Sequence, residues 1–128
     1  MLDPKQILND SHTIAVLGVN KDSDSYANKI VRKIRSLHKI AYPINPKYNE
    51  LFGDVVYESI EKCPSTPDLV VFVVNPSIGI HYLQTIKELG IKHIWLQPGT
   101  ISVELLEQAK NLNLDVIDAC VLVVGNYI

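Results

Sequence analysis

The 128-residue sequence is poor in cysteine, in net charge and in long apolar runs, and each shortage argues against a class of protein. Cys63 and Cys120 lie far apart with no histidine cluster nearby, so neither a disulfide framework nor a zinc site is indicated. A net charge of −2 lacks the basic excess of a general nucleic-acid binder. The longest apolar run, residues 69–74, is too short to cross a bilayer, and the N-terminus does not have the pattern of a signal peptide. We therefore expect a cytoplasmic protein with no nucleic-acid or membrane partner.

Catalytic motifs are missing as well. The sequence has no GxSxG elbow, no P-loop lysine motif and no paired acids at a pocket-like position. Its four histidines fall on different expected elements, without carboxylate or cysteine partners at the spacing of metal ligands. These absences predict no catalytic residue and no metal site, and they favour a binding protein over an enzyme.

Strand-like and helix-like segments alternate along the chain. This alternation predicts an α/β fold in a single domain over residues 1–128, with a doubly wound, mostly parallel sheet of five to six strands and helices on both faces. Asp3, Ser102 and either Asp24 or Ser25 are the expected helix caps. The helix after Ser102 is expected to bury Leu105, Leu106, Ala109 and Leu112. The expected strands are 13–17, 39–45, 55–57 at an edge, 69–74, 93–96 and 116–117, and the main helices are 27–37, 76–89 and 103–112.

Four loops follow predicted strands and should therefore meet along one edge of a parallel sheet, where such folds bind ligands. They begin at Gly18, Asn45, Asn75 and Gln97. The first of them leads from a strand directly into a helix start, which gathers unpaired backbone NH groups and the positive end of a helix dipole. This junction predicts a phosphate site.

The nature of the nucleotide follows from what the first two loops contain. An NAD site of the usual kind needs GxGxxG in the first loop and an acidic residue about twenty positions later. Here only Gly18 is present, and the second strand ends in Asn45, Pro46 and Lys47. A lysine at this point suits an extra phosphate on the adenosine ribose, as in NADP or coenzyme A. The missing glycines make NADP the less favoured of the two.

Several segments, in this order, resemble the small stand-alone CoA-binding proteins, relatives of the CoA-binding domain in the succinyl-CoA synthetase α subunit. They are AVLGVN, SY, YPINPKY, the apolar strand before NP, HIWLQPG and LDVIDAC. The resemblance implies a Rossmann-like fold and coenzyme A, or an acyl-CoA, as the ligand. It implies ligand contacts for Gly18, Val19, Asn20, Ser25, Tyr26, Asn45, Pro46, Lys47, Val74, Asn75, Pro76, Gln97 and Gly99.

The sequence departs from this family at two places. Asp22 and Asp24 bring negative charge into the first loop, where it opposes a diphosphate unless the side chains point away. The ending CVLVVGNYI lacks the basic character typical of the family. Local structure also offers simpler roles: Gly18 suits a tight turn, Gln97 suits a residue that satisfies turn backbone, and Cys120 suits a core position.

Three functions remain open at this point. The favoured one is a non-catalytic module that binds coenzyme A or an acyl-CoA, with a second copy of the chain in a homodimer as a candidate partner. A second is an NAD(P)-binding oxidoreductase or redox sensor, although the chain has no winged DNA-binding domain. A third is a detached subunit of an acyl-CoA synthetase, whose ATP-grasp partner would supply the catalytic histidine and the nucleotide grasp.

Overall fold

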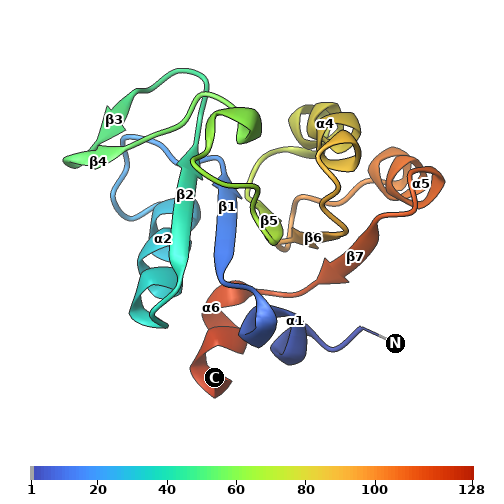
Figure 1. Ribbon diagram of the computed structural model, residues 1–128, viewed down its shortest axis with the longest axis horizontal. Coiled ribbons are helices and arrows are strands. Elements are labelled where there is room, and N and C mark those ends of the chain that lie inside the picture. Colours follow the sequence, from blue (N-terminus) through green and yellow to red (C-terminus); the bar gives the residue numbers. More distant parts are fainter. Residues whose placement is uncertain (1) are drawn as a thin grey trace.

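A five-stranded parallel sheet forms the centre of the computed structural model, which describes residues 2–128 (Figure 1). The strand order is β2-β1-β5-β6-β7, which confirms the predicted Rossmann-like α/β class. Because β2 and β5 lie on opposite sides of β1, the strand order reverses at β1 and a crevice is expected beyond the carboxyl ends of β1 and β5. The strands are β1 (Thr13–Leu17), β2 (Ile40–Ile44), β5 (Leu69–Phe72), β6 (His93–Leu96) and β7 (Asp115–Asp118).

Helices pack on both faces of this sheet, as predicted (Figure 1). The side chains of β1 alternate between the two faces: Ile14 and Val16 join one core cluster, and Ala15 and Leu17 join the other. All four are fully buried, which is the state expected of a central parallel strand. One face carries α1 (Pro4–Asp10), α2 (Tyr26–Ser36) and α6 (Val121–Val124), and the other carries α4 (Leu83–Glu88) and α5 (Val103–Asn111).

The predicted helix caps are present. The side chains of Asp3, Ser25 and Ser102 accept backbone NH groups at the starts of α1, α2 and α5. For α2 the cap is therefore Ser25 and not Asp24. The predicted buried face of α5 is wrong at Leu106, which is 39% exposed because the helix turns Leu105 and Ala109 toward the sheet.

The segment predicted as one helix over residues 76–89 is broken. It consists of α3 (Pro76–Gly79), a 3₁₀ turn (Ile80–Tyr82) and then α4. Apolar residues repeat here at every third position, and the 3₁₀ turn includes only the first of them, Ile80, whereas Leu83 and Ile86 lie in α4. Gly90 ends the segment in the left-handed region with φ of +79°.

The expected edge strand at residues 55–57 is also wrong. β4 (Asp54–Val55) pairs with β3 (Glu50–Leu51) in a separate antiparallel hairpin, and only Tyr57 reaches the main sheet, through a bridge to Ile44. The two residues of the turn, Phe52 and Gly53, both have positive φ, the backbone that tight hairpins require. A short 3₁₀ turn (Ile60–Lys62) follows the hairpin.

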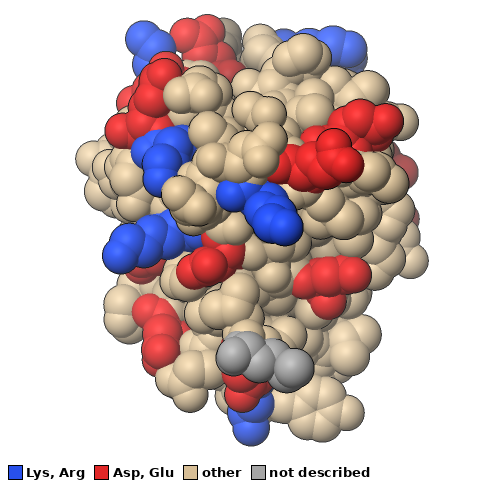
Figure 2. Space-filling view, turned by 90° about the vertical axis from the view of Figure 1, so that its right-hand side faces the viewer, with Lys and Arg blue, Asp and Glu red and all other residues tan. Residues whose placement is uncertain are grey.

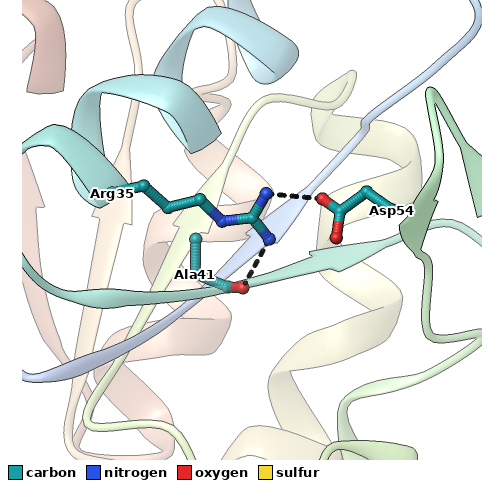
Figure 3. A network of polar contacts seen from close by, with 3 residues as sticks. All are labelled: Arg35, Ala41 and Asp54. Atoms are coloured by element: carbon teal, nitrogen blue, oxygen red, sulfur yellow. Dashed lines mark hydrogen bonds and ion pairs between the residues drawn. The ribbon is translucent and has the colours of Figure 1, made fainter.

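An arginine anchors this hairpin to the rest of the molecule (Figure 3). Arg35 on α2 places Nη1 2.6 Å from Oδ2 of Asp54 and donates through Nη2 to the carbonyl oxygen of Ala41 at 3.3 Å (Figure 3). Both side chains of the pair are about two-fifths exposed, so the ion pair itself adds little stability. Its effect is to fix the hairpin over the start of β2.

The surface fits the modest net charge. In Figure 2, acidic and basic side chains are interspersed with uncharged ones, and neither sign covers the face. None of the helices in residues 2–128 combines the length and apolar character that a membrane crossing requires.

Candidate functional site

The loops after four of the parallel strands leave the sheet side by side. Backbone hydrogen bonds connect them: Gly18 donates to Ile44 at 3.2 Å, Val73 to Leu17 at 3.1 Å, and Gln97 to Phe72 at 3.3 Å. Each bond joins the end of one strand to its neighbour. The predicted meeting of these loops along one edge is therefore confirmed.

Gly18 lies where the loops after β1 and β5 touch. Its φ is +107°, and a Cβ atom at this position would lie 2.4 Å from the carbonyl oxygen of Val73 and 3.0 Å from Cγ1 of Val74. No side chain fits in that space. The glycine is thus required by packing at the point where the strand order reverses.

The first loop is held by the side chain of Asn28, which is 7% exposed. Its Nδ2 donates to the carbonyl oxygens of Asn20 at 2.7 Å and Asp22 at 2.6 Å, and its Oδ1 accepts the NH of Asn20 at 3.4 Å. Sequence reasoning missed Asn28, because it lies in the first turn of α2 among the apolar positions of that helix. Its one sequence signal is that it is the polar residue on an otherwise apolar face.

The two acids of the first loop take part in the loop's own structure. Asp22 accepts the NH of Asp24 through Oδ1 at 2.9 Å, and its carbonyl oxygen accepts the NH of Ser25 at 3.0 Å. Arg32 donates to the carbonyl oxygen of Ser23 at 2.9 Å. The carboxylate of Asp22 is therefore turned back onto its own loop, and both acids remain exposed to solvent.

Free backbone donors lie at the start of α2. Within residues 2–128, no acceptor is found for the backbone NH of Tyr26 or Ala27, while Ser25 caps the NH of Asn28 at 3.3 Å. The Nζ of Lys29, on the same first turn of α2, lies 5.7 Å from the ring centroid of Tyr26. Two NH groups, a helix dipole and a lysine together suit a phosphate group.

Asn45 connects the first loop to the predicted phosphate-binding lysine. Its Nδ2 donates to the carbonyl oxygen of Val19 at 2.8 Å, and its Oδ1 accepts the NH of Lys47 at 2.8 Å. Pro46 and Lys47 are exposed. Val19 is 2% exposed and packs in the core on the α2 side of the sheet.

The remaining predicted site residues continue along the same edge, with one exception. Val74 is half-buried beside Gly18, Asn75 caps α3 by accepting the NH of Ser77 at 3.0 Å, and Pro76 is the first residue of that helix. Gly99 is exposed with φ of +87°.

The exception is Gln97, whose side chain turns into the interior and is 3% exposed. Its Oε1 accepts the NH of Val121 at 2.8 Å and the indole NH of Trp95 at 3.1 Å, and its Nε2 lies 3.5 Å from Sγ of Cys120. These bonds fix the C-terminal α6 against the sheet. Only the backbone of Gln97 remains at the edge.

The strand order and the helices on both faces define a Rossmann-like α/β fold. The chain belongs to the CoA binding domain family, whose pattern matches residues 12–126.

Relatives of two kinds are similar to this chain. The acetate–CoA ligase (ADP-forming) I of Archaeoglobus fulgidus is 34% identical over 81 residues, which are 63% of this chain and 11% of the ligase. A hypothetical protein from Pyrococcus horikoshii OT3 has a TM-score of 0.88 at 25% identity, over 96% of this chain and 87% of its own. A conserved hypothetical protein from Pyrococcus furiosus has a TM-score of 0.79 at 31% identity, over 88% of this chain and 97% of its own. The chain thus spans about a tenth of the ligase and most of each small protein.

The contact at Gly18 predicts a large loss of stability on Gly18→Ala. We expect the free energy of unfolding to fall by about 3–5 kcal/mol, because the variant combines a strained φ with a clash against the backbone of Val73. Gly53→Ala is the matched control: its φ is +76° but nothing lies within 4 Å, so it should lose only about 1 kcal/mol. Urea denaturation of both variants measures the difference. Equal losses would show that the close approach carries no cost.

Removing the Asn28 side chain should loosen the first loop. Asn28→Ala leaves the carbonyl oxygen of Asn20 without a donor and that of Asp22 with only the NH of Ser25, and we expect a loss of about 1–3 kcal/mol in the free energy of unfolding. Hydrogen exchange should become faster in residues 20–25. Asn111→Ala, at an exposed position in α5, is the control and should change stability by less than about 0.5 kcal/mol. Unchanged exchange in residues 20–25 would contradict this role.

Proposed function

We propose that this protein binds coenzyme A, free or acylated, along the carboxyl edge of its sheet and is a binding module without a reaction of its own. The observation that carries the proposal is the pair of free NH groups at the start of α2, the helix that follows β1, where the strand order reverses, in a chain of the CoA binding domain family. Such a helix start favours the negative charge of a diphosphate.

The strand order gives the bound ligand a direction. The diphosphate lies at β1 against the NH groups of Tyr26 and Ala27. The adenosine end extends over the outer strand β2 to Lys47, and the pantetheine arm extends the other way, past Val74 and Asn75 in the loop after β5. A ligand laid in this way crosses each of the loops that the backbone bonds hold together.

Lys47 is the cation we assign to the 3′-phosphate. Among residues 2–128, no carboxylate lies within ion-pair distance of its ammonium group, whereas Arg35 is paired with Asp54. Arg32 is the competing cation, since it lies on the first turns of α2 and contacts the first loop. With either Lys47 or Arg32 as the cation, we expect coenzyme A to bind more tightly than dephospho-coenzyme A, and NADP more tightly than NAD.

Calorimetry with coenzyme A and dephospho-coenzyme A tests this assignment. Loss of the 3′-phosphate should weaken binding by about 1.5–3 kcal/mol, the value of a charge-assisted hydrogen bond, or roughly 10–150-fold. In Lys47→Ala, coenzyme A and dephospho-coenzyme A should bind equally. Lys110→Ala, an exposed lysine near the opposite edge of the sheet, should keep the full preference.

Two results would overturn parts of this proposal. A preference that survives Lys47→Ala and disappears in Arg32→Ala would move the phosphate contact to Arg32. Tighter binding of NADP or NAD than of coenzyme A would replace the ligand itself, and it would favour the oxidoreductase or redox-sensor alternative.

A second candidate function is a component of an ADP-forming CoA ligase. It is favoured by the similarity to the Archaeoglobus fulgidus ligase, of which this chain covers only 11%. In this case a partner with an ATP-grasp fold would supply the catalytic groups. Affinity purification of the tagged protein from its native cells should then recover such a partner in a stoichiometric complex. A homodimer or monomer alone, seen by light scattering, would leave the binding module as the function.

A further inference from the structure

We propose that the cleft between the starts of α3 and α5 holds the acyl group of a neutral acyl-CoA and disfavours acyl groups that end in a carboxylate. The cleft has a volume of about 500 Å³. It is lined by Asn75, Pro76, Ser77, Ile80, Ser102 and Glu104. The inference rests on the proposed function, because it assigns the far end of the same ligand.

The position of the cleft follows from the strand order. Its walls come from the segment after β5, which includes Asn75, and from the start of α5 after β6, which includes Glu104. Neighbouring strands are about 4.8 Å apart, so the step from β1 to β6 is about 10 Å. If the 3′-phosphate lies over β2 and the diphosphate at β1, the thiol end is directed over β5 toward β6. The pantetheine arm is long enough to reach the cleft.

The two walls are held at a fixed separation. A Cβ atom at Gly79 would lie 2.9 Å from Cδ2 of Phe72 and 3.4 Å from Cδ1 of Leu105, so α3 packs closely on both β5 and α5. The cleft is therefore formed before a ligand enters, and binding does not have to order it. Pro76 and Ile80 supply apolar surface for an alkyl chain.

The polar groups of the cleft select among acyl groups. Asn75 uses its Oδ1 to accept the NH and hydroxyl of Ser77, at 3.0 and 2.9 Å, and within residues 2–128 its Nδ2 has no acceptor. This group can donate to the carbonyl oxygen of a thioester. Glu104 lies on the first turn of α5 and has no ion-pair partner among the described residues. Its carboxylate repels an acyl group that ends in a carboxylate, such as succinyl. It does not repel a neutral acyl group, such as butyryl.

Calorimetry with coenzyme A, butyryl-CoA and succinyl-CoA tests the inference on the full chain. Butyryl-CoA should bind about tenfold more tightly than coenzyme A, which corresponds to burial of about two methylene groups. Succinyl-CoA should bind about tenfold more weakly than butyryl-CoA. Glu104→Gln should reduce this second ratio to threefold or less. Glu107→Gln, one turn further along α5 and outside the lining, is the matched control and should keep it.

The possible outcomes separate this inference from the function on which it rests. If coenzyme A itself does not bind, both are wrong. If coenzyme A binds but butyryl-CoA shows no gain, or if Glu104→Gln and Glu107→Gln change the succinyl-to-butyryl ratio equally, the acyl cleft is wrong and the coenzyme A module stands. Ile80→Ser is an independent test, because it removes apolar surface from the cleft. In the folded variant, the ratio of butyryl-CoA affinity to coenzyme A affinity should be smaller.

Discussion

The carboxyl edge of this sheet depends on one backbone contact, between Gly18 and Val73. The helices that follow β1 and β5 pack on opposite faces, so the two loops must diverge above the sheet. They stay in contact at their base only because residue 18 has no side chain. This arrangement leaves only backbone at residue 18, where the strand order reverses. The start of α2 follows β1 through a loop that the side chains of Asn28 and Asn45 hold in place.

Two side-chain amides fix the conformation of the first loop by donating to its carbonyl oxygens. Asn28 holds the first loop from the side of α2, and Asn45 holds it from the side of β2. The first loop contains a single glycine, Gly18. It lies at the position where the loop approaches the backbone after β5, at Val73. Asn45 also accepts the NH of Lys47, so one side chain links the first loop to the turn that contains Lys47. The amides therefore position both ends of the proposed nucleotide site.

Much of the fold could be predicted because its signals are local. The central strands β1, β5 and β6 are apolar runs that end at Gly18, at Asn75–Pro76 or at Gln97–Pro98, and each helix cap lies one residue before its helix. The same strand ends predicted that the loops meet at one edge. The errors fall where the local sequence carries no clear signal for the structure. The hairpin of β3 and β4 was not predicted, because Glu50 and Leu51 have no strand pattern of their own.

The site residues show the same limit. Asn28 acts through carbonyl groups of a loop that only the folded chain brings under it. The inward turn of Gln97 depends on α6, which lies more than twenty residues further on. Nothing in the local sequence around either residue reports these partners. The exposed positions such as Lys47 are easier to propose, because their chemistry depends on the residue type and the strand end alone.

The acidic residues of the first loop pose the main electrostatic objection to a bound diphosphate, and the structure offers a physical answer. Asp22 uses Oδ1 to accept the NH of Asp24, and both carboxylates are exposed, so solvent and salt screen them over about 8 Å. The NH groups at the helix start act over hydrogen-bond distance and are screened much less. Lys29 adds positive charge on the same turn of α2. In the proposed complex, a diphosphate at the helix start therefore gains more from these short-range donors than it loses to two carboxylates that solvent screens.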